Sequence, residues 1–140
     1  MNNHLMLWPL LVQVLLTIFI FIVLAKRKKQ SIADGTANRE AAALDNKAWP
    51  EDVVKASNNI ENQFQTPVLF YALCLAFVVN NGVTAITLSL AWVYAVSRIA
   101  HAYIHVGSNY VPKRLRYFMI GVVSLIAMAV ILGLQLAGLY

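Results

Sequence analysis

Long apolar runs alternate with short polar segments along this 140-residue chain. The first run, residues 5–25, carries no charge, and at a rise of 1.5 Å per residue it is long enough to cross a hydrocarbon core about 30 Å thick. The pattern predicts an all-α membrane protein, a single four-helix transmembrane bundle. The four helices are expected over residues 5–25, 50–79, 83–106 and 114–137, with a loop over residues 26–49.

Composition and charge agree with a membrane protein. Hydrophobic residues make up 60% of the chain and charged residues 12%, about half the charged share of soluble domains. Of the 11 Lys and Arg, seven lie between Lys26 and Lys55, three between Lys113 and Arg116, and the last is Arg98. Basic residues gather on the cytoplasmic side of membrane helices, which accounts for the net charge of +5 without a nucleic-acid partner. We therefore expect an integral multi-pass membrane protein, of the plasma or inner membrane if the source is bacterial, with both basic loops in the cytoplasm and both termini outside.

Ionisable residues inside the third apolar segment mark a candidate site. Arg98, His101 and His105 stand at i, i+3 and i+7, a spacing that places them on one stripe of a helix. The second segment repeats this spacing with three polar residues, which are Asn58, Glu61 and Gln65. Because polar groups that face lipid are costly, we expect the two stripes to face each other inside the bundle and form the site.

Two interpretations of these stripes need no organic ligand. Glu61 and Arg98 could form a structural intramembrane ion pair, while His101 and His105 join helices as neutral, hydrogen-bonded rings. Alternatively, the two histidines at i and i+4 have the spacing of helical zinc ligands, and Glu61 could complete a set. No metal is expected, because Arg98 would repel a dication and Ala102 occupies the position of the glutamate in the zinc-protease motif.

A third interpretation is an anionic, peptide-like ligand. Arg114 lies at the expected start of the fourth helix, where free backbone amides and the helix dipole favour negative charge. Arg114 and Arg98 could receive carboxylates or a thiolate, whereas Asn58 and Glu61 could bind an amine or an amide. This set of groups fits glutathione, which carries two carboxylates, an ammonium group and a thiol.

The polar motifs of the second and third segments also resemble those of a known family. The matching residues are Asn58-Asn59-Ile60-Glu61 with Pro67, then Arg98-Ile99-Ala100-His101 with His105, Gly107, Pro112 and Arg114. With these residues the chain resembles the MAPEG proteins, membrane-associated proteins in eicosanoid and glutathione metabolism. The family includes microsomal glutathione transferases and membrane prostaglandin E and leukotriene C synthases.

The resemblance implies a homotrimer with sites between subunits and glutathione as co-substrate. The implied reaction is a transferase or peroxidase reaction on a lipophilic electrophile that arrives from the bilayer lipids. Arg114 would be the catalytic residue that holds the thiolate. The positions implied to bind glutathione are Asn58, Glu61, His101, His105 and Arg114.

Some positions depart from the prostaglandin synthase branch. Ser57 stands where that branch has an arginine that grips a carboxylate, although Lys55 could partly replace it. His105 and Phe118 stand where that branch has tyrosines. The alternative to an enzyme is therefore a non-catalytic membrane protein of the same fold that binds lipid or a protein partner.

Overall fold

The computed structural model describes residues 2–140, which form helices joined by short turns and contain no strand. Four stretches are long and apolar enough to cross a membrane, as the sequence predicts: Asn3–Ala33, Glu51–Val79, Ala85–Val106 and Val111–Leu136. The elements in chain order are η1 (Asn3–Met6), α1 (Leu7–Ala33), α2 (Arg39–Ala42), η2 (Asn46–Ala48), α3 (Glu51–Gln63), α4 (Thr66–Val79), α5 (Ala85–Val106) and α6 (Val111–Leu136).

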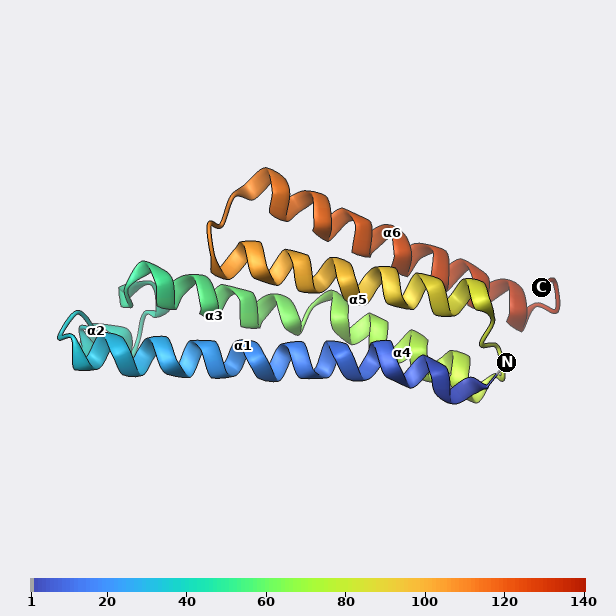
Figure 1. The fold of residues 1–140 in the computed structure, drawn as a ribbon, viewed down its shortest axis with the longest axis horizontal. Coiled ribbons are helices and arrows are strands. Elements are labelled where there is room, and N and C mark those ends of the chain that lie inside the picture. The colour runs from blue at the N-terminus through green and yellow to red at the C-terminus, as the bar shows by residue number, and fades with distance from the viewer. Residues whose placement is uncertain (1) are drawn as a thin grey trace.

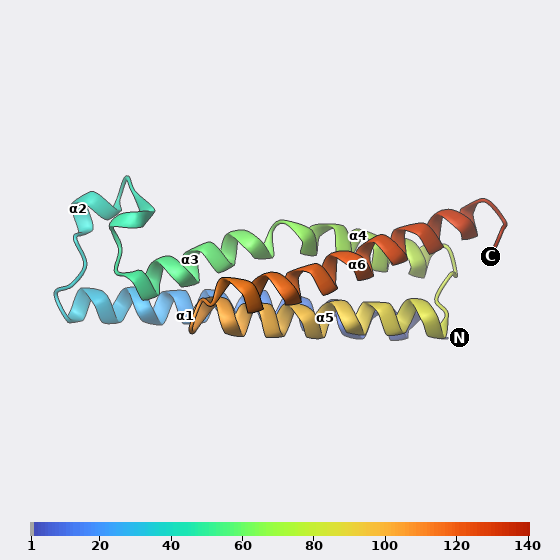
Figure 2. The ribbon, with the colours of Figure 1, turned by 90° about the horizontal axis from the view of Figure 1, so that it is seen from above.

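The four spans form an up-and-down bundle. Figure 1 shows both termini at one end, together with the α4–α5 turn, and the loop that carries α2 at the other end. The α5–α6 connection points toward the α2 end, so the two basic loops lie on the same side of the bundle. In Figure 2, α6 runs obliquely from α5 toward α4, and it contacts both helices.

The first helix is longer than expected. It continues past Ala25 through the basic run 26–29 and ends at Ala33. Lysine, arginine and glutamine are good helix formers, so the charge that ends the apolar span does not end the helix. The connecting loop therefore begins at Asp34 and contains the short helix α2.

The second span is two helices with a break between them. α3 ends at Gln63 and α4 begins at Thr66, one residue before Pro67. Proline has no amide hydrogen, so the carbonyl of Gln63 cannot receive the usual bond from four residues on. The helix expected over residues 50–79 is thus interrupted completely before Pro67, and carbonyl groups are left free at the end of α3.

Apolar and polar residues occupy different halves of the interior. The apolar core lies toward the termini and includes Phe70 stacked on Tyr94, with ring centroids 4.3 Å apart. α5 and α6 approach closely beside it, because a Cβ on Gly121 would lie only 2.9 Å from the Ser97 hydroxyl. Small residues allow such close approach in membrane bundles. The other half of the interior, toward the basic loops, contains the polar residues of the candidate site.

Candidate functional site

Helix α3 turns a different face toward the bundle than the sequence suggests. Its buried residues are Val53, Ala56, Asn59 and Gln63. The expected stripe of Asn58, Glu61 and Gln65 is exposed. The prediction that this stripe faces Arg98, His101 and His105 is therefore wrong for the single chain. Packing of Val53 and Ala56 against the bundle fixes the rotation of α3, and this rotation brings Asn59 and Gln63 inward.

A buried hydrogen-bonded chain of amides joins α1 to α3. Gln13 Nε2 donates to Gln63 Oε1 at 2.8 Å, and Gln63 Nε2 donates to Asn59 Oδ1 at 2.8 Å. All three side chains are inaccessible or nearly so. Amide bonds of this kind hold membrane helices together, so Gln13, the one strongly polar residue among residues 5–25, fixes the register of α1 against α3.

Arg98 does not pair with Glu61. Its side chain is 1% exposed, and its Nη2 donates to the backbone carbonyl of Asn62 at 3.2 Å, whereas Glu61 is exposed. The expected Glu61–Arg98 ion pair is therefore absent from the chain. Arg98 instead lies at the carboxyl end of α3, where free carbonyls and the negative end of the helix dipole favour a cation.

The one ion pair among residues 2–140 joins Lys55 to Glu51. Lys55 Nζ lies 2.7 Å from Glu51 Oε1, one turn apart on α3. Lys55 is the residue that could replace the carboxylate-gripping arginine missing at Ser57. Because its ammonium group already pairs with Glu51, it would have to exchange that partner to bind a ligand.

His101 fixes the beginning of α6. Its Nδ1 lies 3.0 Å from the backbone carbonyl of Arg114. A carbonyl can only accept a hydrogen bond, so Nδ1 carries the hydrogen and, in the neutral ring, Nε2 carries the lone pair. The Nε2 atom is buried and has no hydrogen-bond partner. His101 thus offers an unused acceptor beside Arg114.

Asn62 joins α3 to the histidines of α5. Its Nδ2 donates to the carbonyl of Asn58 at 3.0 Å and lies 3.4 Å from His105 Nδ1. His105 in turn packs edge-on against His101, with ring centroids 5.6 Å apart. Asn62 is not among the residues that the sequence nominates, because the i, i+3, i+7 spacing selects its neighbours Asn58 and Glu61.

Arg114 lies in the first turn of α6, where no acidic residue offsets its charge. Its Nη1 donates to Oδ1 of Asn109, which also caps α5 through a backbone bond from its amide to the Ile104 carbonyl. Asn109 has a φ of 53°, a left-handed conformation that asparagine tolerates well. The Gly107-Ser108-Asn109 sequence signals such a turn, but nothing in it signals the contact with Arg114.

Asn62, His101 and Arg114 line a cavity of about 190 Å³. Its lining residues come from three helices and are Asn62, His101, Val111, Arg114, Leu115 and Phe118. Asn58 and Glu61 lie outside it on the exposed face of α3. Pockets for small organic ligands usually measure about 300 to 1,000 Å³, so within one chain the cavity admits part of a tripeptide. Among residues 2–140, no three His, Cys, Asp or Glu side chains cluster as metal ligands.

Comparison with known proteins gives one match. The sequence model of the MAPEG family matches residues 5–134, nearly the whole 140-residue chain. Searches of curated proteins and of solved structures each found no significant match.

Proposed function

Because the chain belongs to the MAPEG family, an integral membrane family often linked to glutathione, we propose that it is a glutathione-dependent transferase or peroxidase acting on a lipophilic electrophile. The observation that carries the proposal is the arrangement at the start of α6. Arg114 and His101 line one cavity, with a cation from the former and a free ring acceptor from the latter. A cation stabilises a thiolate, and an adjacent acceptor can take the proton that the thiol loses.

Glutathione supplies a thiolate nucleophile to such a reaction. The guanidinium of Arg114, together with the amino-terminal end of α6, stabilises the negative sulfur, and a cation beside a thiol lowers the thiol pKa. The Nε2 lone pair of His101 is the acceptor for the proton that the thiol loses. His101 also holds the Arg114 backbone through Nδ1, so one ring positions the cation and receives the proton.

The remaining groups suit the polar ends of the tripeptide. Glu61 is exposed and unpaired among the described residues, so its carboxylate can bind the ammonium group. Asn58 is exposed one turn earlier, and the Asn62 amide lies between Asn58 and His105. Together with Arg114, these residues supply donors and acceptors both inside the cavity and on the exposed face of α3 beside it.

The proposal includes a homotrimer with sites completed by a neighbouring subunit. Two features of the single chain support it. The cavity is smaller than the usual pocket for a small organic ligand, and Asn58, Glu61 and Gln65 are exposed within a stretch that is long and apolar enough to cross a membrane. Amides and a carboxylate that face lipid are costly, so protein or ligand must cover this face. The proposed orientation has the basic loops, and hence Arg114, on the cytoplasmic side, where glutathione is available.

Two assays on the protein in lipid vesicles test the reaction. In the first, sulfur displaces chloride from a chloronitrobenzene, forming a C–S bond and releasing chloride ion. In the second, two glutathione molecules reduce a lipid hydroperoxide to an alcohol and water and leave as the disulfide. Arg114→Gln should lower the rate of whichever of the two reactions the wild-type protein catalyses by roughly 100- to 1,000-fold, the usual loss for a group that stabilises a developing anion. Arg39→Gln, an exposed arginine on α2, is the matched control.

One observation favours the alternative of a non-catalytic protein that binds lipid or a protein partner. Ser57 offers no charge for a carboxylate, and Lys55 is paired with Glu51. Glutathione binding in the absence of either activity would select this alternative. Absence of both binding and activity would exclude glutathione chemistry altogether.

A further inference from the structure

An apolar groove of about 350 Å³ runs between α1 and α5 on the surface of the bundle, separate from the candidate site. Leu15 and Phe19 line it from α1, and Ile99 and Tyr103 line it from α5. These four side chains are between 42% and 79% exposed, so nothing in the chain fills the groove. Its lining contains no acidic or amide side chain.

The groove lies in the half of the membrane next to the basic loops. The end of the groove nearest the basic loops is called its upper end here. At this end, Arg27 Nη2 donates to the carbonyl of Val106 at 2.8 Å, which places Arg27 level with the end of α5. At its lower end is Val12, fifteen residues before Arg27, or about 22 Å along the helix. Half of a bilayer, counted with its headgroup region, is about 20 to 22 Å thick. The groove therefore follows one leaflet from its surface to about the bilayer midplane, the depth that a lipid acyl chain occupies.

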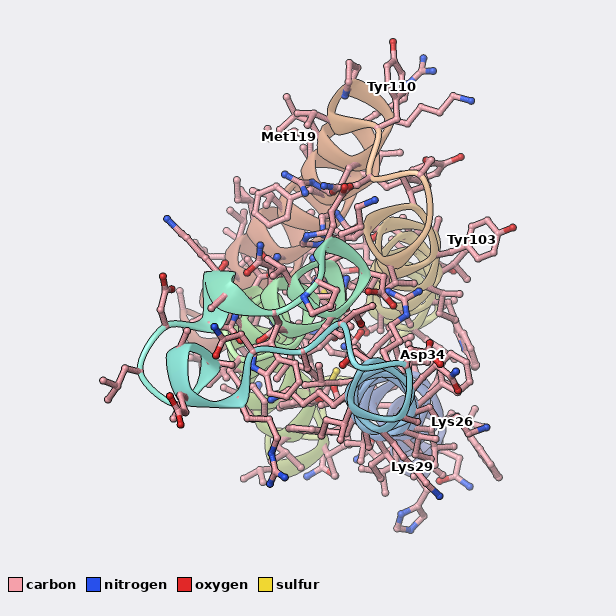
Figure 3. The ribbon with its side chains drawn as sticks, turned by 90° about the vertical axis from the view of Figure 1, so that its left-hand side faces the viewer. Lys26, Lys29, Asp34, Tyr103, Tyr110 and Met119 are labelled. Carbon is pink, nitrogen blue, oxygen red and sulfur yellow. The ribbon has the colours of Figure 1, made fainter. Side chains whose placement is uncertain are left out.

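Positive charge lies at the upper end of the groove. Lys26 stands seven residues after Phe19, which places it on the same stripe of α1, and its side chain is exposed. Figure 3, seen from the basic-loop end, shows Lys26 of α1 and Tyr103 of α5 projecting on the same side of the molecule. Arg27 adds a charge that is fixed there by its bonds to the carbonyls of Asp52 and Val106. Tyrosine favours the level of the lipid headgroups.

We propose that this groove binds an anionic phospholipid, with an acyl chain against Phe19 and Ile99 and the headgroup phosphate at Lys26 and the Tyr103 hydroxyl. The order of the side chains, apolar below and cationic above, is the order of groups in such a lipid. A second copy of the chain is the less suitable occupant, because the polar groups that require protein cover lie on α3 instead. The site is independent of glutathione.

Native mass spectrometry of the delipidated oligomer, with phosphatidylglycerol and phosphatidylcholine added separately, tests the proposal. Phosphatidylglycerol should bind at a lower lipid concentration than phosphatidylcholine does. A basic residue near the surface contributes to anionic-lipid binding by about five-fold, so Lys26→Gln should weaken it by about that factor. Tyr103→Phe should also weaken it. Lys47→Gln, which removes an exposed lysine in η2 away from the groove, is the matched control.

Three results would overturn the proposal. Equal binding of both lipids would remove the requirement for negative charge. An equal loss with Lys47→Gln would mean that the lipid follows overall charge rather than this groove. Displacement of the lipid by inorganic phosphate at similar concentration would show a phosphate site without a role for the acyl chain. Since both substituted side chains are exposed, unchanged melting temperatures should accompany the expected result.

Discussion

The guanidinium of Arg98 donates a hydrogen bond to the backbone carbonyl of Asn62 over 3.2 Å, in the last turn of α3. Arg98 is 1% exposed and has no acidic partner among residues 2–140, so this contact satisfies its Nη2 atom while Nε and Nη1 are buried without a hydrogen-bond partner. The break before Pro67 provides carbonyl groups, and the dipole of α3 directs its negative end toward them. Arg98 thereby holds in place the residue whose side chain lines the cavity.

This contact predicts that Arg98 and Glu61 contribute independently to stability. Arg98→Met should lower stability by about 1.5 to 3 kcal/mol, the range for a hydrogen bond to a charged group. Glu61→Gln should change it little, because Glu61 is exposed. In a double-mutant cycle followed by melting in detergent, the two effects should add to within about 0.5 kcal/mol. A larger coupling energy would show that Arg98 and Glu61 do interact, and would contradict their separation in the structure.

The buried amide chain predicts a compensating pair of substitutions. Gln13→Leu leaves Gln63 Oε1 without its donor, and an unsatisfied buried polar group costs roughly 1 to 3 kcal/mol. Gln13→Leu combined with Gln63→Leu removes both groups of this bond but leaves Asn59 Oδ1 without its donor, so the double variant should recover only part of that loss. Thermal unfolding in detergent measures the difference. If the double variant is less stable than both single variants, the amides do not act as a pair.

Sequence patterns were sufficient to predict the fold. Apolar runs long enough to span and the two basic loops each act locally, so the chain itself indicates four spans, whereas the break between α3 and α4 appears only in the structure. The end of α1 was missed because charge marks the edge of the hydrocarbon and not the edge of a helix. Ala33 instead marks the point where helix-forming residues give way to Asp34 and Gly35.

The site was harder to predict, because helical spacing identifies residues that share a face but not what that face meets. Arg98, His101 and His105 are indeed buried together on α5. The rotation of α3, however, depends on Val53 and Ala56 packing against the rest of the bundle, and this packing turns Glu61 outward and Asn62 toward His105. The contact between Asn109 and Arg114 similarly depends on a turn conformation that asparagine permits but does not require.

The two nitrogens of His101 predict different effects from two substitutions. In His101→Asn, the side-chain amide nitrogen takes the place of Nδ1 and can still donate to the Arg114 carbonyl, but the Nε2 acceptor is lost. Melting temperature and glutathione binding should survive, while the conjugation rate should fall about 100-fold, as for loss of a general base. His101→Leu should lower all three. A fully active asparagine variant would leave His101 with a positioning role only.

The distribution of basic residues predicts the orientation in the membrane. A cysteine introduced at Ala43, in the loop that carries α2, should react with impermeant thiol reagents only after cells are opened. A cysteine at Ala137, just after α6, should react in intact cells. The native Cys74 is buried and gives a low background. Labelling of Ala43→Cys from outside intact cells would reverse the orientation.

The ultraviolet absorbance of a thiolate, followed during a glutathione titration of the purified oligomer, tests the proposed chemistry most directly. Arg114 is expected to hold the bound sulfur as an anion, so the wild-type protein should give a thiolate signal that saturates with glutathione near neutral pH. Arg114→Met should abolish that signal, whereas the exposed-site control Arg39→Met should retain it. Saturable binding of glutathione without a thiolate signal in the wild-type protein would contradict the role of Arg114.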